Sequence, residues 1–344
     1  MLEHLAVVGA TGVVGREFLA LAEERKLPVE KITLLASPRS AGTRVRFGGR
    51  ELVVETLSAE RLSGVTLALF SAGREVALEF APVVAGAGGV VVDNSSAFRM
   101  NDDVPLVIPE VNQEDLSSHR GIIANPNCTT IVLLMAVGPI HRAFPIERIV
   151  VSTYQAASGA GRRAMDELKR QTRDYLDCKP LRPEAFPHPI AFNLFAHDSP
   201  VADNGYNGEE LKVIAETRKI LHAPSLAIAP TCVRVPILRA HSESINLTFR
   251  ESVSPDRIRD VLEAAPGVCV VDDRQGSRFP MPMEASGRDD VLVGRIRSDI
   301  SRSDGRGIEL FVSGDQLRKG AALNAIQIIE SLFKHSRAKS ITTR

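Results

Sequence analysis

The first 130 residues alternate short apolar runs with segments of helix length, and this alternation limits the possible folds more than any other feature. The apolar runs are "LAVVG", "KITLLAS", "TLALFSAG", "GVVVDNS" and "GIIANP", and helical patterns such as "GREFLALAEER" lie between them. Strands connected in this way pair in parallel, with crossover helices on the faces of the sheet. The pattern therefore predicts an α/β fold with an open, doubly wound parallel sheet.

A glycine-rich loop follows the first predicted strand. The stretch "LAVVGATGVVG" places Gly9, Gly12 and Gly15 between a strand and a helix. Glycine is needed there for a tight turn and for close approach of backbone N–H groups to a pyrophosphate, which the helix N-terminus also favours. The plain alternative is an ordinary strand-to-helix turn. Because the loop opens the alternating pattern, we favour a dinucleotide site and a Rossmann-type domain.

The end of the second predicted strand bears on the choice of cofactor. NAD-binding domains usually place an acidic residue there, about 20 residues beyond the glycines, to bind the ribose 2′-hydroxyl. In this chain "ITLLAS" continues into "PRSAG" without an acid. Arg39 and Ser40 can instead bind a 2′-phosphate, although Arg39 could also be a plain surface arginine. The missing acid favours NADP.

The pattern changes after about residue 148. Helical patterns such as "GRRAMDELKRQTRDYL" and apolar runs such as "VLVGRIR" no longer alternate strictly, which indicates an α+β domain with a partly antiparallel sheet. The Pro-rich stretch 178–206 reads as an ordered loop or packing arm, since it is rich in Phe and other apolar residues. We predict a dinucleotide-binding domain over 1–130, completed by a C-terminal helix at 315–336, and a catalytic and dimerisation domain over 131–314.

Charge and composition exclude several classes of protein. The formal net charge is zero, so no overall field favours nucleic acid or an anionic membrane. There is no apolar run long enough to span a bilayer and no signal-peptide layout, so we expect a cytoplasmic protein that binds small molecules. The four cysteines lie far apart without a CxxC pair, which argues against a zinc site or a disulfide framework. No metal is expected.

One of these cysteines has the surroundings of a nucleophile. In "IIANPNCTT", Cys128 lies between a predicted strand and the predicted helix "TTIVLLMAVGPI". It is therefore expected at the carboxyl edge of the sheet and at a helix N-terminus, where backbone N–H groups stabilise a thiolate. The alternative is a buried, inert cysteine. A thiolate beside a nicotinamide adds to an aldehyde, and loss of hydride leaves a thioester that phosphate or water cleaves.

Candidates for the other roles lie mostly in the second domain. His241 could transfer a proton, because the pKa of histidine lies near neutrality. Glu209 and Lys212 are three residues apart on one predicted helix, where they could bind an ammonium group and an anion respectively. The alternative interpretation is a solvated ion pair on an exposed helix. Arg99 is expected at the end of another parallel strand, where it could contact phosphate, and Arg234 lies in "CVRVP".

Taken together, these motifs make the sequence resemble the aspartate-β-semialdehyde dehydrogenase family over nearly its whole length. The matching motifs are "GATGVVG", "SSAFRM", "NPNCTT", "YQAASGAG", "EELK", "CVRVPILRAHSE" and "VGRIR", in the family's order. The resemblance implies NADPH-dependent reductive dephosphorylation of L-aspartyl-4-phosphate to L-aspartate 4-semialdehyde, on the route to lysine, methionine, threonine and isoleucine. It also implies a homodimer or a dimer of dimers, with the second domain forming the interface.

The resemblance assigns roles to individual residues. It implies that Cys128 is the nucleophile, that His241 is the acid and base, and that Gln155 orients the acyl intermediate. Arg234 would bind the substrate α-carboxylate and Glu209 its amino group, while phosphate would meet Arg99 and Lys212. Asn127 would complete the substrate site. The residues that would line the NADP site are Gly9, Thr11, Gly12, Val13, Val14, Arg39, Ser40, Ser158, Gly159 and Asn324.

Three rival hypotheses remain open at this stage. N-acetyl-γ-glutamyl-phosphate reductase shares the fold and the thioester chemistry, but its substrate has no ammonium for Glu209 to bind. Glyceraldehyde-3-phosphate dehydrogenase fits poorly, because of its usual NAD preference and its different cysteine surroundings. A catalytically inactive relative that acts as a binding protein is disfavoured because Cys128, Gln155, Arg234 and His241 are present together.

Overall fold

The structure is a computed structural model that describes the backbone of residues 2–342 and the side chains of residues 2–333. The chain forms two compact units. The first contains residues 1–127 and 321–344, and the second contains residues 128–320. The chain therefore enters the second unit at Cys128 and returns to the first at Ala321.

The first unit is built on a six-stranded sheet in which every pair of neighbouring strands is parallel. Its order is β5-β2-β1-β6-β7-β8. The strands are β1 (Leu2–Val8), β2 (Val29–Ala36), β5 (Glu55–Thr56), β6 (Leu67–Phe70), β7 (Val90–Asp93) and β8 (Ile122–Ala124). The runs predicted as strands form β1, β2, β6, β7 and β8, whereas the two-residue β5 was not predicted. The predicted doubly wound fold is confirmed.

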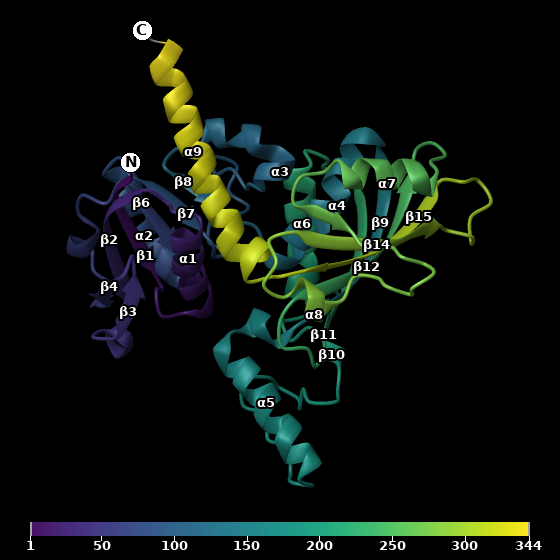
Figure 1. Cartoon of the computed structure of the whole chain (residues 1–344), viewed down its shortest axis with the longest axis horizontal. Helices are drawn as coiled ribbons and strands as arrows, with labels where there is room; N and C mark the ends of the chain where they lie inside the picture. Colours follow the sequence, from purple (N-terminus) through teal and green to yellow (C-terminus); the bar gives the residue numbers. More distant parts are fainter. Residues whose placement is uncertain (1, 343–344) are drawn as a thin grey trace. The chain divides into compact units, whose positions relative to one another are not determined.

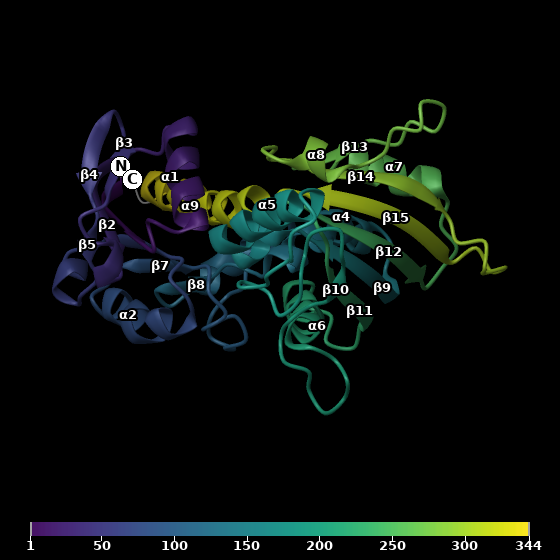
Figure 2. The ribbon, with the colours of Figure 1, turned by 90° about the horizontal axis from the view of Figure 1, so that it is seen from below.

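Helices cover both faces of this sheet. They are α1 (Val13–Glu24), α2 (Arg74–Gly86), α3 (Pro109–Asn112) and α9 (Leu323–Thr342). Figure 2 shows α1 and α9 on one side of the strands and α2 on the other. Apolar side chains of α1 and α9 share one buried cluster with those of β1 and β2, including Phe18, Leu5, Leu34 and Ile326.

The second unit contains a seven-stranded mixed sheet in the order β10-β11-β9-β12-β15-β14-β13. Most neighbours are antiparallel, but β9 pairs with β11 and β13 with β14 in parallel. Figure 1 shows its central strands side by side. The strands are β9 (Ile146–Gln155), β10 (Phe195–Ala196), β11 (Ala227–Arg234), β12 (His241–Phe249), β13 (Val268–Val270), β14 (Val291–Ser298) and β15 (Gly307–Gly314).

One face of this sheet carries a layer of helices. The helix α4 (Cys128–Ala143) contacts β9, β12, β14 and β15, while α6 (Gly208–Ile220) lies on β11 and α7 (Pro255–Glu263) on β13 and β14. Inward side chains alternate along the strands, and in β11 every second residue is buried. The predicted partly antiparallel sheet with one helical face is therefore confirmed. A short helix, α8 (Pro282–Ala285), completes this region.

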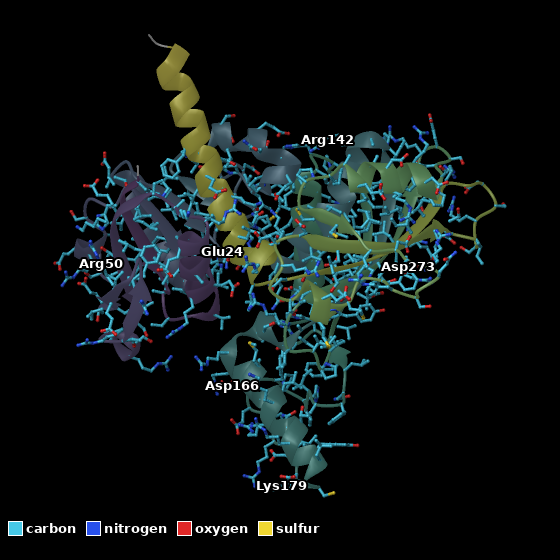
Figure 3. The ribbon with its side chains drawn as sticks, in the orientation of Figure 1. Glu24, Arg50, Arg142, Asp166, Lys179 and Asp273 are labelled. Carbon is cyan, nitrogen blue, oxygen red and sulfur yellow. The ribbon has the colours of Figure 1, made fainter. Side chains whose placement is uncertain are left out.

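The Pro-rich stretch after α5 (Arg162–Leu176) is ordered, as predicted. In Figure 3, Asp166 marks α5 and Lys179 lies just beyond its end. Gln171 of α5 is buried and accepts the N–H groups of Ile190 and Ala191 at 2.8 and 3.2 Å. These bonds to a helix, together with buried apolar side chains such as Phe186, hold the stretch as a packing arm.

The structure also contains elements that the sequence patterns did not indicate. A hairpin of β3 (Arg44–Phe47) and β4 (Arg50–Val53) follows β2 in the first unit, and its strands are short and mostly exposed. The helix predicted at 315–336 is instead a π-helical turn, Arg318–Ala322, followed by α9 from Leu323.

Candidate functional site

The predicted nucleophile is the first residue of α4. Cys128 begins this helix and is half-buried, and its Sγ lies 3.5 Å from Nε2 of His241. Space beside the thiol is limited, because a Cβ on Gly320 would come within 3.1 Å of the Cβ of Cys128. The helix N-terminus adds partial positive charge. The structure thus brings together the two residues predicted as nucleophile and proton carrier.

The imidazole of His241 is held in one orientation. The backbone N–H of Ala156 donates to Nδ1 at 3.0 Å, so Nδ1 is an acceptor and the proton of the neutral ring belongs on Nε2. That N–H faces Cys128. The prediction of a near-neutral pKa was wrong: burial, followed by the charge of Arg234, lowers the pKa of His241 to about 3. The ring is therefore neutral at physiological pH.

The other predicted residues of the second unit occupy the same end of its sheet. Arg234 and Gln155 are the last residues of β11 and β9 and pair directly in the sheet register, and His241 is the first residue of β12. Because the neighbouring strand runs antiparallel, the start of β12 meets the end of β9. Strand ends far apart in sequence thus meet at one edge.

A buried hydrogen-bond network joins this edge to the helices above it. The amide of Gln155 donates to Thr129 Oγ1 at 2.8 Å and to Glu209 Oε1 at 3.1 Å. Thr129 follows the thiol in α4, and Glu209 lies in the first turn of α6. Gln155 therefore connects the helix that carries the nucleophile with the helix that carries the predicted ammonium ligand.

Glu209 and Lys212 contact each other. The Nζ of Lys212 lies 3.2 Å from Oε2 of Glu209, whose side chain is only 5% exposed. The pair is not the fully solvated ion pair that was the alternative interpretation, because Glu209 is buried inside the network. The carboxylate lies on the buried side of α6, where it also accepts a hydrogen bond from Gln155 at the end of β9.

Sequence patterns missed the partner of Arg234. Nε of Arg234 donates to Oδ1 of Asp198 at 3.2 Å, and the guanidinium lies over the ring of Phe186 at 5.7 Å from its centroid. Both partners come from the Pro-rich stretch 178–206. The neighbouring His197 is also part of this cluster, and burial and the charge of Arg234 lower its pKa to about 4. The polar letters "HDS" in an otherwise apolar stretch were the available signal.

Two residues further from this edge, the same face of the sheet carries Glu243 and Thr153. Glu243 pairs with Thr153 in the register, two residues along β12 from His241, and it is fully buried. Within the part of the chain that the structure describes, neither carboxyl oxygen of Glu243 has a hydrogen-bond partner. Burial raises the pKa of Glu243 well above its usual value. Burial thus disfavours the charged form of this carboxyl group.

The glycine loop of the first unit has the predicted geometry. Gly9 has a positive φ of 89°, and a Cβ there would lie 2.7 Å from the backbone oxygen of Ser71. A Cβ on Gly15 would lie 2.3 Å from the oxygen of Gly9, so helix α1 packs against the loop as only glycine allows. Gly12 is the N-cap of α1 and supplies no side-chain hydrogen bond. With Thr11, Val13 and Val14, the loop presents main-chain groups at the helix start.

The residues after β2 remain available for a ligand. Arg39 is exposed in the short 3-10 turn Pro38–Ser40, and it has no ion pair among the described residues. Asn324 of α9 is different. It is fully buried, and its amide donates to the oxygen of Val107 at 2.9 Å and to Oδ1 of Asn125 at 2.7 Å. The geometry gives Asn324 a structural role in the first unit.

Two predicted substrate residues also belong to the first unit. Arg99 was expected at the end of a strand, but β7 ends at Asp93 and Arg99 lies in the loop beyond it. It is buried, and it donates to the backbone oxygens of Asn125 at 3.0 Å and Asn94 at 3.1 Å. Asn127 is also buried and ends the first segment of this unit.

The last two predicted cofactor residues lie in the second unit. Ser158 is buried in the 3-10 turn Ala157–Ala160, and its Oγ accepts a hydrogen bond from Gln316. A Cβ on Gly159 would come within 3.1 Å of both Nη1 of Arg234 and Cε1 of His241. Gly159 therefore borders the charged cluster and keeps the space between these two side chains open.

Within the residues that the structure describes, no helix is long and apolar enough to cross a membrane. The same residues also contain no group of three or more His, Cys, Asp or Glu side chains arranged to hold a metal ion.

Profiles of known protein families match both units. A profile described as "Semialdehyde dehydrogenase, NAD binding domain" matches residues 4–119. A second profile, "Semialdehyde dehydrogenase, dimerisation domain", matches residues 137–319. The two matches follow the division into compact units, apart from the returning helix α9.

Individual relatives agree with the profiles. The chain is 52% identical to an aspartate-semialdehyde dehydrogenase of Synechocystis, over 96% of this chain and 97% of the relative. It is 48% identical to the Bacillus subtilis protein of the same name, with coverage of 96% and 97%. The solved structure of aspartate semialdehyde dehydrogenase II complexed with ASA from Vibrio cholerae superposes with a TM-score of 0.92 at 44% identity, covering 96% and 98% of the two chains. This chain belongs to the aspartate-semialdehyde dehydrogenase family.

Proposed function

We propose that the chain catalyses the reversible, NADPH-dependent reductive dephosphorylation of L-aspartyl-4-phosphate to L-aspartate 4-semialdehyde and phosphate. The observation that carries this proposal is the cluster at one edge of the second sheet. There a half-buried thiol lies 3.5 Å from a neutral histidine, and the strand ends beside them carry Gln155 and Arg234. Membership of the family supplies the substrate class.

Cys128 would act as the nucleophile on the acyl phosphate. Its thiolate attacks the acyl carbon, the bond to the phosphate oxygen breaks, and a thioester remains on Sγ. The partial positive charge at the start of α4 stabilises the thiolate before attack. The bound nicotinamide would supply the hydride that reduces the thioester. The resulting thiohemiacetal oxyanion then collapses and expels the thiolate, which restores the enzyme.

His241 would act mainly as a hydrogen-bond donor in this cycle. With Nδ1 occupied by the N–H of Ala156, the Nε2 proton points toward Sγ. It can stabilise the thiolate first and the oxyanion of the thiohemiacetal afterwards. In the reductive direction, attack on the acyl phosphate, hydride addition and collapse need no proton from the ring. The low pKa of His241 is therefore compatible with catalysis.

Charged side chains would select the amino-acid end of the substrate. The planar guanidinium of Arg234 suits a carboxylate, and the buried carboxylate of Glu209 suits an ammonium. Lys212 and Arg99 are assigned to the phosphate, and Asn127 to the substrate site. A substrate without these charges would leave buried charges unpaired, which is costly. An N-acetylated substrate has no ammonium for Glu209, so the aspartyl substrate is favoured.

NADP is the proposed cofactor. The uncapped start of α1, with the glycines before it, is suited to a pyrophosphate, and Arg39 and Ser40 to a 2′-phosphate. A related solved structure, from Candida albicans, is described with NADP; it has a TM-score of 0.74 at 25% identity, covering 96% of this chain and 98% of that chain. Ser158, Gly159 and Asn324 remain proposed cofactor contacts, and the amide of Asn324 is held by Val107 and Asn125.

We further propose that the protein is a cytoplasmic homodimer. The profile over 137–319 describes a dimerisation domain, and the sheet face of the second unit opposite its helices is partly exposed. Size-exclusion chromatography with light scattering tests the dimer, and a monomer at micromolar concentration would contradict it.

The experiment that tests the function is a reverse assay. Purified protein is incubated with L-aspartate semialdehyde and NADP, with and without inorganic phosphate, and NADPH absorbance is followed. Reduction of NADP that depends on phosphate is the expected result. Activity only with N-acetylglutamate semialdehyde would support the rival reductase and overturn the roles of Glu209 and Arg234. No turnover with either aldehyde would indicate a binding protein.

A further inference from the structure

The arm between α5 and α6 carries a carboxylate that the mechanism above does not use. Asp198 is 25% exposed at its side chain, while that of its partner Arg234 is only 7% exposed. On the basis of the proposed function, we propose that Asp198 is a positioning residue for substrate recognition. It holds Arg234 by Nε, so that the two Nη groups face the α-carboxylate of the substrate.

The hydrogen bonds of Arg234 divide its guanidinium into an occupied and an open side. Among the described residues, Asp198 is the only side chain that accepts a hydrogen bond from the guanidinium of Arg234, and it uses only Nε. Nη1 lies 3.1 Å from the position of a Cβ on Gly159, and Cε1 of His241 is equally close to that position. The open side of the guanidinium is thus directed toward the reacting end of the cluster, and a carboxylate can bind it through two N–H groups.

A second residue of the arm contacts the face of the guanidinium. The ring of Phe186 lies 5.7 Å from the guanidinium carbon, and Phe186 is itself buried against Leu168 and Ile190. A cation over an aromatic face is attracted to it at such a distance. The arm therefore contacts both a face and one edge of the group that is to receive the substrate.

Asp198 is itself held from both sides. Before it, β10 pairs with β11 so that Phe195 lies opposite Arg234, and the N–H of His197 donates to the oxygen of Cys232 at 2.8 Å. After it, Ser199 Oγ accepts the N–H of Glu209 at 3.0 Å, at the start of α6. A carboxylate between two such attachments can set the position of a partner, which a carboxylate on an untethered loop could not.

The neighbouring histidine does not compete for this carboxylate. Nδ1 of His197 lies 3.7 Å from Oδ1 of Asp198, but that nitrogen accepts the N–H of Ser199 at 3.2 Å. Burial and the charge of Arg234 also keep the ring neutral, because they lower the pKa of His197 to about 4. Arg234 is therefore the cation that Asp198 holds.

The test compares Asp198→Ala, Asp198→Asn and a control, Asp203→Ala, in the reverse assay with saturating NADP and phosphate. Asp203 lies exposed in the same arm, and its substitution removes the same charge. For Asp198→Ala we expect the KM for L-aspartate semialdehyde to rise between about 10-fold and about 100-fold, because a misplaced guanidinium binds the carboxylate poorly. Since the reacting atoms are unaffected, kcat and the KM values for NADP and phosphate should stay near those of the wild type.

Asp198→Asn should restore most of the affinity, because its amide oxygen still accepts the Nε hydrogen bond. Asp203→Ala should match the wild type, and thermal unfolding should show all variants folded. A KM for Asp198→Ala equal to or below that of the wild type would overturn the inference, and a fall in KM would mean that Asp198 competes with the substrate. Equal losses for all three substrates would indicate general damage and also overturn it. If wild-type protein shows no phosphate-dependent turnover, the proposed function fails and takes this inference with it.

Discussion

The two units present their proposed ligand sites in different ways. In the first unit, the glycine loop and the start of α1 offer main-chain groups, and glycines at 9 and 15 are required by close backbone contacts. In the second unit, the edge of the sheet offers side chains, and Gln155, Arg234 and His241 reach it from three strands. A main-chain site tolerates changes of side chain that a side-chain cluster does not. Substitutions should therefore have larger effects in the second unit.

The largest effect is expected for the thiol. Cys128→Ser should lower kcat by at least about 1,000-fold, since a hydroxyl at neutral pH is a much weaker nucleophile than a thiolate. NADP binding, measured by fluorescence titration, should persist because the main-chain loop is unchanged. Substantial residual reductase activity would remove Cys128 from the role of nucleophile.

The second prediction concerns the shape of the substrate ligand. Arg234→Lys keeps the charge but loses the planar fork and the Nε donor that Asp198 accepts. We expect kcat/KM for L-aspartate semialdehyde to fall by about 100-fold, as for a misplaced binding group. Steady-state kinetics checks this, and near-normal values would contradict a bidentate contact.

The third prediction concerns Arg39, the one charged side chain proposed for the NADP site of the first unit. Arg39→Ala should raise the KM for NADPH by about 10-fold or more through loss of a charge-assisted hydrogen bond, and should leave the KM for NADH nearly unchanged. Parallel titrations with the two cofactors measure the difference. Equal losses for both would show that Arg39 does not contact a 2′-phosphate.

The smallest effect is a pH dependence of stability that belongs to the second unit. The pKa values of His241 and His197 are lowered from 6.5 to about 3 and about 4. Below about pH 6.5 these two histidines bind protons in the unfolded chain but stay neutral in the folded chain. The free energy of unfolding therefore decreases as the pH falls from about 6.5 toward 4. Each histidine should contribute up to about 1.4 kcal/mol per pH unit.

Urea unfolding of wild type and His197→Asn at several pH values tests this expectation. The variant should lose less stability between pH 6.5 and about 4, since one of the two histidines no longer takes up a proton on unfolding. Identical slopes would show that His197 does not remain neutral in the folded protein.

The comparison also explains what could be predicted from the sequence. The strand and helix periods predicted both sheets, and the glycine loop was recognisable because its residues are consecutive. Cys128 could be placed at a helix start for the same local reason. The ion pair of Arg234 with Asp198 could not, since the two residues are brought together only by pairing of β10 with β11. Nor could the low pKa of His241, which arises from burial that no local pattern reveals.

The return of the chain to its first unit has a consequence for biosynthesis. The side chains of Leu323, Ala325, Ile326, Ile328 and Ile329 belong to the same buried cluster as those of β1 and α1. During synthesis, the first 127 residues leave the ribosome before α9 does. At usual rates of synthesis the delay is roughly ten seconds or more. During that interval the nascent first unit exposes an apolar surface, whereas the second unit is already complete in sequence by Gly320. The unit that begins first is therefore expected to finish folding last.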